Sequence, residues 1–199
     1  MTAEQLASPI GNMKLLEAQN KTAFLSSRHT PESCYDAIRA WLDSLSPEHD
    51  VVLVGNLQRL ESYVFQGLIK RNIPAILVLS TPYPELWPTY VVDAIGEGRL
   101  LIISTSYFSL PWMDRYDVAF DRNKYMIEKS ERVVVGMCRP GGFLSQQLAV
   151  AKQVTILNEY QHPGKAQTDE PTPQTEQPQS ETQHDNDLNP TSGNVETTI

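Results

Sequence analysis

Six short apolar runs, separated by longer segments with helical spacing, are the feature of this sequence that most limits its fold. The runs are rich in Val, Ile and Leu and lie at residues 22–26, 50–55, 74–80, 99–104, 132–137 and 153–157. Between them, apolar residues recur at intervals of three and four in segments 35–45, 57–70, 85–95, 114–130 and 143–152. Buried strands that alternate with helices are typical of a parallel sheet covered on both faces. The sequence therefore predicts an α/β, Rossmann-like domain with a mostly parallel sheet and helices on both faces.

The composition divides the chain. Residues 161–199 are mostly Gln, Thr, Pro, Asn and acids, and carry seven acidic residues against one lysine, so this tail accounts for −6 of the net charge of −8. Such a segment cannot bury enough apolar surface to offset its ordering entropy. We expect an N-terminal extension at 1–20, a Rossmann-like domain at 21–158 and a disordered acidic tail at 161–199. Residues 1–160 are nearly neutral, so their charge does not predict a strong electrostatic attraction for nucleic acid.

Several classes of protein are not indicated. The sequence shows no signal-peptide pattern and no apolar run of about 20 residues that could span a bilayer, so we expect a cytoplasmic protein that does not bind a membrane. Cys34 and Cys138 lie too far apart for a zinc site and have no histidine at ligand spacing. We interpret both as interior residues, and we expect neither a metal nor a cofactor.

Small and polar residues follow the apolar runs. In open parallel sheets, ligands bind beyond the carboxyl ends of the strands. The residues at these ends are Ser26, Ser27 and Arg28, then Gly55 and Asn56, then Ser80 and Thr81, and last Arg139 to Gly142. They predict a pocket. The alternative is that strand-to-helix turns use such residues only for turn and cap chemistry.

Two further segments are candidates for anion binding. Gly141 and Gly142 precede a predicted helix, where backbone N–H groups can bind phosphate and Ser145 can cap the helix or donate. Arg122, Asn123 and Lys124 lie in a helix-like segment, where a guanidinium can bind phosphate in two-point fashion. The alternatives are a simple tight turn at the glycines and a solvated helix face at Arg122 and Lys124.

In order and spacing, these segments resemble the DprA/Smf family of DNA-processing proteins in bacterial transformation. The likeness covers roughly residues 20–158, and its motifs are "FLSSR" (24–28), "VLSTPYPELWP" (78–88), "RNKYMIEKSERVVVG" (122–136) and "PGGFL" (140–144). The resemblance implies an extended Rossmann fold, binding of single-stranded DNA, a RecA-type recombinase as partner and a possible homodimer. It assigns the binding site to Ser26, Ser27, Arg28, Gly55, Ser80, Thr81, Arg122, Asn123, Lys124, Gly141, Gly142 and Ser145.

The sequence departs from the family at glycine-rich turns. "VGNLQRLES" keeps only Gly55 where the family has several glycines, and Ser80 and Phe143 replace a glycine and a serine of the family's motifs. Glycines let a backbone approach phosphates closely. Three functions therefore stay open: a single-stranded DNA-binding protein, which we favour, a nucleotide-binding or nucleotide-processing domain, and an interaction scaffold with a degenerate pocket.

Catalysis is not predicted. The LOG-type phosphoribohydrolases of the same superfamily carry a PGGxGTxxE pattern, and its second glycine and its glutamate correspond to Leu144 and Leu148 here. A leucine cannot act as acid or base. The aromatic connection at 105–116, with Tyr83 and Trp87, could stack on unpaired bases or mediate self-association, but packing is the favoured interpretation.

Overall fold

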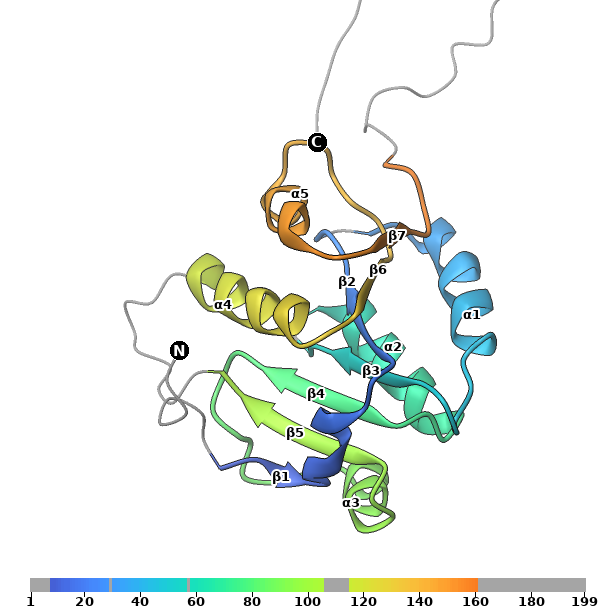
Figure 1. Cartoon of the computed structure of the whole chain (residues 1–199), viewed down its shortest axis with the longest axis vertical. Coiled ribbons are helices and arrows are strands. Elements are labelled where there is room, and N and C mark those ends of the chain that lie inside the picture. Colours follow the sequence, from blue (N-terminus) through green and yellow to red (C-terminus); the bar gives the residue numbers. More distant parts are fainter. Residues whose placement is uncertain (1–7, 29, 57, 106–114, 161–199) are drawn as a thin grey trace, which may run out of the picture. The chain divides into compact units, whose positions relative to one another are not determined.

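The apolar runs form one seven-stranded sheet with the strand order β1-β5-β4-β3-β2-β6-β7 (Figure 1). The computed structural model describes residues 8–28, 30–56, 58–105 and 115–160. Six parallel strands correspond to the six runs: β2 (Lys21–Leu25), β3 (Val51–Val54), β4 (Ala75–Leu79), β5 (Leu100–Ser104), β6 (Arg132–Val135) and β7 (Val154–Ile156). The Rossmann-like prediction is confirmed.

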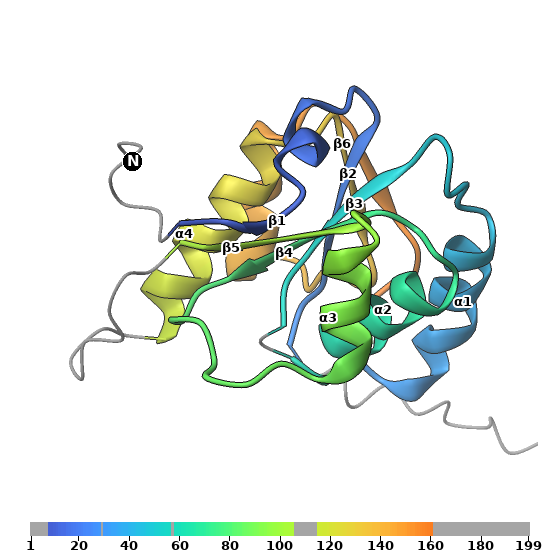
Figure 2. The same cartoon turned by 90° about the horizontal axis from the view of Figure 1, so that it is seen from below.

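Helices cover both faces of the sheet (Figure 2). Apolar residues of α1 (Tyr35–Asp43), α2 (Arg59–Lys70) and α3 (Thr89–Gly96) pack in one cluster with alternate residues of the strands. The other strand residues pack against α4 (Arg115–Glu128), α5 (Phe143–Gln147) and the short 3-10 helix η2 (Met13–Glu17). The 3-10 turns η3 (Glu32–Cys34) and η4 (Leu148–Val150) flank α1 and α5. Two apolar layers, one on each side of the sheet, form the core.

The chain reverses its direction of travel across the sheet at β2. From β2 it proceeds outward through β3, β4 and β5, and then returns to place β6 on the other side of β2. The connections that leave the carboxyl ends of β2 and β6 therefore diverge to opposite sides. A topological switch point of this kind opens a crevice, which is the usual ligand position in doubly wound folds.

Three elements differ from the sequence-based expectation. The two-residue strand β1 (Ile10–Gly11) pairs antiparallel with β5, and it is too short to produce a detectable pattern. At Gly11, φ is +108° and an added Cβ would overlap the carbonyl oxygen of Leu100, so glycine is required there. Helix α3 begins at Thr89 rather than at 85, because Pro82, Pro84 and Pro88 disfavour helix before it.

Strand β7 is not buried, and the expectation that every strand is apolar and covered on both faces is wrong for it. All three of its residues are exposed, with Ile156 at 53%. The reason is its position, since β7 is the edge strand of the sheet beyond β6.

The described residues all belong to one compact unit, Met1–His162. None of the helices in this described part is long and apolar enough to cross a membrane. The predicted acidic tail at 161–199, the first seven residues of the chain and residues 106–114 of the aromatic connection lie outside the described residues.

Candidate functional site

A cavity of about 1190 Å³ lies at the switch point. Connections that leave the carboxyl ends of four strands line it, together with residues of α4. Its wall consists of Ser26, Ser27, Arg28, Thr30, Glu32, Tyr35, Gln58, Arg59, Leu60, Ser80, Thr81, Val118, Ala119, Arg122, Asn123, Arg139, Pro140, Gly141, Gly142, Phe143 and Leu144. Of the predicted site residues, the fold therefore brings together Ser26, Ser27, Arg28, Ser80, Thr81, Arg122, Asn123, Gly141 and Gly142. Gly55, Lys124 and Ser145 are not part of the wall.

Two serines join the connections on either side of the switch point. The Ser26 hydroxyl accepts the N–H of Met137 at 3.1 Å and lies 2.8 Å from the Thr30 hydroxyl. The Ser27 hydroxyl accepts the N–H of Arg139 at 2.9 Å. The segment after β2 is thus held to the segment after β6 by side-chain bonds, which fixes one wall of the cavity.

Arg122 is a buried residue with an acidic partner, not part of a solvated helix face. Its side chain is 2% exposed, and its Nη1 and Nη2 atoms donate to the carboxylate oxygens of Glu61 at 2.9 and 2.8 Å. Nη2 also donates to the Asn123 amide oxygen at 2.8 Å. Because the Glu61 carboxylate neutralises this guanidinium, Arg122 brings little net charge to the cavity.

The network continues through two amides. Asn123 Nδ2 donates to the side-chain oxygen of Gln147 at 3.0 Å, and Gln147 Nε2 donates to the carbonyl oxygen of Phe120 at 3.0 Å. A glutamate of α2, two residues of α4 and a glutamine of α5 are thereby connected across the sheet edge. Each of the four side chains in this network has a hydrogen-bond partner, as a stable buried network requires.

Gly55 leaves room for the Arg122 side chain of this network. A Cβ added at this position would overlap Arg122 Nη1 and would lie 2.7 Å from Glu61 Oε2. The glycine therefore makes room for the ion pair. This packing role explains why the sequence keeps a glycine here although Gly55 does not line the cavity.

The remaining predicted residues lie at the margin. Lys124 is exposed on α4 and lies 4.0 Å from Glu128. The Ser145 hydroxyl donates to the carbonyl oxygen of Gly142 at 2.7 Å, and the Gly142 N–H donates to the carbonyl oxygen of Arg139 at 3.1 Å. Helix α5 has only five residues, so the helix dipole at this turn is weak.

Of the three arginines on the rim, Arg28 was assigned to the site from the sequence, Arg139 was named only as a residue at a strand end, and Arg59 was not named. Arg28 and Arg139 line the cavity from the connections after β2 and β6, Arg59 lines it from the start of α2, and all three are exposed. Arg59 Nη2 lies 3.9 Å from Glu32 Oε1. The position of Arg59 at the start of the helix that follows β3, at the sheet edge where ligands bind, is the signal that could have found it.

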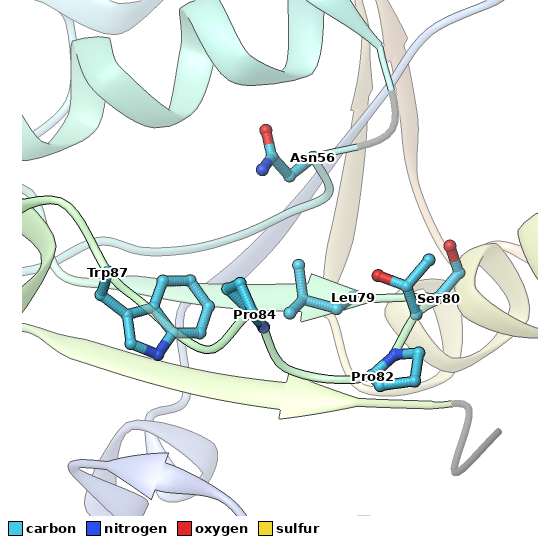
Figure 3. Close-up of a pocket in the computed structure, with 7 residues that line it drawn as sticks. Asn56, Leu79, Ser80, Pro82, Pro84 and Trp87 are labelled. Atoms are coloured by element: carbon cyan, nitrogen blue, oxygen red, sulfur yellow. The ribbon is translucent and has the colours of Figure 1, made fainter. Parts of the chain in front are cut away.

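A second, smaller cavity of about 210 Å³ adjoins the first, because Ser80 and Thr81 line both. Its other lining residues are Asn56, Leu79, Pro82, Pro84 and Trp87 (Figure 3). The Ser80 side chain is buried, and its hydroxyl oxygen has no hydrogen-bond partner among the described residues.

Among the described residues, neither a histidine nor a cysteine lines the large cavity. Leu144, at the glycine position of the phosphoribohydrolase pattern, packs into the apolar cluster with α4. Burial raises the pKa of the Cys138 thiol, which precedes Arg139, so this thiol stays protonated at neutral pH. The described residues contain no cluster of three or more His, Cys, Asp or Glu side chains that could hold a metal ion.

Comparison with known proteins identifies the fold. No protein-family model matches the sequence, and no curated protein matches it. Two solved structures are similar to this chain. One is DNA processing protein A from Helicobacter pylori, whose structure concerns a unique single-stranded DNA binding mode; it is 17% identical with a TM-score of 0.56, over 74% of this chain and 69% of that chain.

A second similar structure is that of DNA processing protein A (DprA) from Streptococcus pneumoniae, at 16% identity and a TM-score of 0.51, over 74% of this chain and 62% of that chain. Both likenesses cover about three quarters of this chain and concern the same fold. The DprA-like fold expected from the sequence motifs is therefore confirmed.

Proposed function

We propose that this protein binds single-stranded DNA in the large cavity at the switch point and performs no chemistry on it. The observation that carries the proposal is that Arg28, Arg59 and Arg139 line one cavity from three separate segments of the chain. Exposed arginines around a groove attract a phosphate backbone and bind it in two-point fashion. The fold is also that of a Helicobacter pylori protein described as binding single-stranded DNA.

The rim arginines, rather than Arg122, supply the attraction. Arg122 is paired with Glu61 and buried, whereas the side chain of Arg59 is 88% exposed and its acidic neighbour Glu32 is 84% exposed. A surface pair at 3.9 Å contributes little and is readily replaced by a stronger phosphate contact. We therefore assign Arg122 and Asn123 the role of positioning the wall, and Arg28, Arg59 and Arg139 the role of binding phosphates.

The size of the cavity favours a strand over a mononucleotide. At about 1190 Å³ it exceeds the range of about 300–1000 Å³ that is usual for small-molecule sites. Two aromatic side chains, Tyr35 and Phe143, also line it. Base stacking on aromatic side chains is tolerant of sequence, and this is the recognition that a protein binding single strands without sequence preference requires.

The experiment is fluorescence anisotropy of a labelled single-stranded oligonucleotide with the full chain at several salt concentrations. Replacing Arg28, Arg59 or Arg139 with alanine should weaken binding about tenfold, the loss expected for a hydrogen bond to a charged group of about 1.5 kcal/mol. Each replacement should also lower the slope of log affinity against log salt by about 0.7. Arg39→Ala is the matched control, because Arg39 pairs with Asp36 on α1 and does not line the cavity.

The outcomes separate the three functions that the sequence left open. Displacement of the strand by a mononucleotide at equal concentration, with little salt dependence, would move the assignment to a nucleotide site. Binding that Arg39→Ala weakens as much as the rim variants would show that no particular site is used. If the strand does not bind even at low salt, the third function, an interaction scaffold with a degenerate pocket, is favoured. A RecA-type partner and a homodimer are further proposals from the resemblance, to be tested once strand binding is measured.

A further inference from the structure

The small cavity next to the strand-binding cavity has the chemistry of a base-binding pocket. Its walls are apolar and flat, formed by the Trp87 indole and the rings of Pro82 and Pro84. Figure 3 shows Trp87, Pro84 and Leu79 in a row that ends at Ser80, with Asn56 on the separate segment that follows β3. Three polar side chains, Asn56, Ser80 and Thr81, complete the lining.

Ser80 carries an unused hydrogen-bonding group at the edge of this cavity. The residue is 3% exposed, and its hydroxyl oxygen has no partner in the part of the chain that the structure describes. A buried hydroxyl without a partner lowers the stability of a protein, and such a group calls for an explanation. A ligand with a polar edge at this position would supply the missing bond.

Asn56 presents a donor to the same cavity. Its amide oxygen accepts the hydroxyl of Ser62, which orients the amide. The two N–H groups of Nδ2 have no acceptor among the described residues, and the residue is exposed. A ligand oxygen is the natural partner for these donors.

The wall formed by Leu79 and Thr81 is held in place by hydrogen bonds from the end of β5. The Ser104 hydroxyl donates to the carbonyl oxygen of Thr81 at 2.8 Å, and the Thr105 hydroxyl donates to that of Leu79 at 3.0 Å. Trp87 packs against the apolar cluster on the side of α1 to α3. The segment after β4 is therefore tied to β5, and the cavity keeps its shape.

We propose that this cavity binds one unpaired pyrimidine base of the strand whose backbone occupies the large cavity. Its volume of about 210 Å³ lies below the usual range of about 300–1000 Å³ for small-molecule sites. The cavity therefore suits a single base rather than a complete small-molecule ligand. The base stacks on Trp87, its ring carbonyls accept from Asn56 Nδ2, and the Ser80 side chain turns on binding so that its hydroxyl donates to the base. Ser80 and Thr81, which line both cavities, lie where the strand passes from one to the other. This inference rests on the proposed function.

The test compares binding of an oligothymidylate with binding of an abasic strand of equal length, which keeps the phosphates and lacks the bases. Asn56→Ala should weaken binding of the oligothymidylate about fivefold and leave binding of the abasic strand unchanged. Trp87→Leu should weaken it roughly 5- to 150-fold, the range of one stacked base. Leu86→Ala is the matched control, because Leu86 precedes Trp87 but is 86% exposed and does not line the cavity.

Ser80→Ala gives a second readout that a structural role would not produce. Because the Ser80 hydroxyl lacks a partner, its removal should leave the unfolding midpoint unchanged or raise it, while binding of the oligothymidylate falls about fivefold. A structural hydroxyl would show the reverse, with a lower midpoint and unchanged binding. Asn56→Ala, at an exposed residue, keeps the proposal testable if Trp87→Leu fails to fold.

Each result has one meaning. Equal losses for both strands in Asn56→Ala and Ser80→Ala would overturn the base pocket and leave the phosphate site intact. Free thymidine that binds as tightly as the oligothymidylate would assign the cavity to a nucleoside and overturn the proposal. If neither strand binds the wild-type protein, both the proposed function and the base pocket fall.

Discussion

The guanidinium of Arg122 and the carboxylate of Glu61 form a two-point ion pair with N–O distances of 2.8 and 2.9 Å, and both side chains are almost fully buried. The pair connects α2 with α4 across the carboxyl edge of the sheet. It positions residues of both helices at the wall of the cavity. It also neutralises Arg122, which is the one charged residue of the predicted site that is buried.

Glu61→Gln should lower the free energy of unfolding by about 3 to 5 kcal/mol, because it leaves the Arg122 charge buried without a counter-charge. Chemical denaturation measures the loss. Glu128→Gln, which removes the exposed partner of Lys124, should change the same quantity by less than about 1 kcal/mol. The double variant Glu61→Leu with Arg122→Met should be more stable than Glu61→Gln alone. Equal effects of Glu61→Gln and Glu128→Gln would contradict this account.

Gly55→Ala should destabilise the fold by about 1 to 3 kcal/mol, since the new methyl group displaces a guanidinium that four hydrogen bonds to Glu61 and Asn123 hold in place. Gly96→Ala is the control, because nothing lies within 4 Å of a Cβ at that position in α3. It should leave the thermal midpoint unchanged or raise it slightly. A Gly55→Ala protein as stable as Gly96→Ala would show that the ion pair can shift at no cost.

Cys34 and Cys138 should react slowly with iodoacetamide. Burial raises the pKa of both thiols above the ordinary value of about 8.5, so the thiolate fraction at neutral pH is small. The alkylation rate of the folded protein should be below that of free cysteine at pH 8 and should rise as pH increases further. Cys34→Ser and Cys138→Ser assign the two rates, and Cys34, at 5% exposure, should be the slower. Rates equal to those of the denatured chain would refute the assignment.

The same raised pKa values predict a loss of stability in alkali. The folded protein holds the thiol protons to higher pH than the unfolded chain does, so the stabilisation is complete below about pH 8.5 and declines as pH rises through the folded pKa values. Denaturant midpoints measured from pH 7 to 10 should fall more for the wild type than for Cys34→Ala. Parallel curves would mean that Cys34 does not contribute.

Lys152 should lower the pKa of a single neighbouring group. Its ammonium donates to Glu131 at 2.9 Å and holds the pKa of that carboxyl below the ordinary value of about 4.3. Titration of Glu131 by NMR should show this depression, and Lys152→Gln should raise the pKa toward the ordinary value. An unaltered Glu131 titration in the variant would exclude the pair in solution.

The fold was predictable because the strands are short, continuous apolar runs. Each of the six runs became a strand within one or two residues of its predicted bounds. Strand β1 escaped because two residues carry no periodicity, and β7 was taken as buried because Val154 and Ile156 are apolar although they lie on an edge. Position in the sheet, which is a property of topology, decides exposure there.

The site was predictable in part for a different reason. Residues directly after strands meet at one edge of a parallel sheet, and this rule located the serines, glycines and rim of the cavity. It could not pair Glu61 with Arg122, because that contact spans 61 residues of sequence and depends on where α2 and α4 lie. The spacing of Glu61 with Val64, Phe65 and Leu68 already places a carboxylate on an apolar helix face, where only a buried partner is stable.

The bonds from Ser26 and Ser27 to the segment after β6 have a kinetic consequence for recognition. They are internal to the protein and hold the two sides of the switch point together whether or not a strand is present. A wall ordered in advance loses little conformational entropy on association, and the encounter rate is then set by diffusion and charge rather than by a loop closing. For the proposed strand binding, an oligonucleotide diffused into crystals of this protein would therefore meet one wall of the cavity already in place.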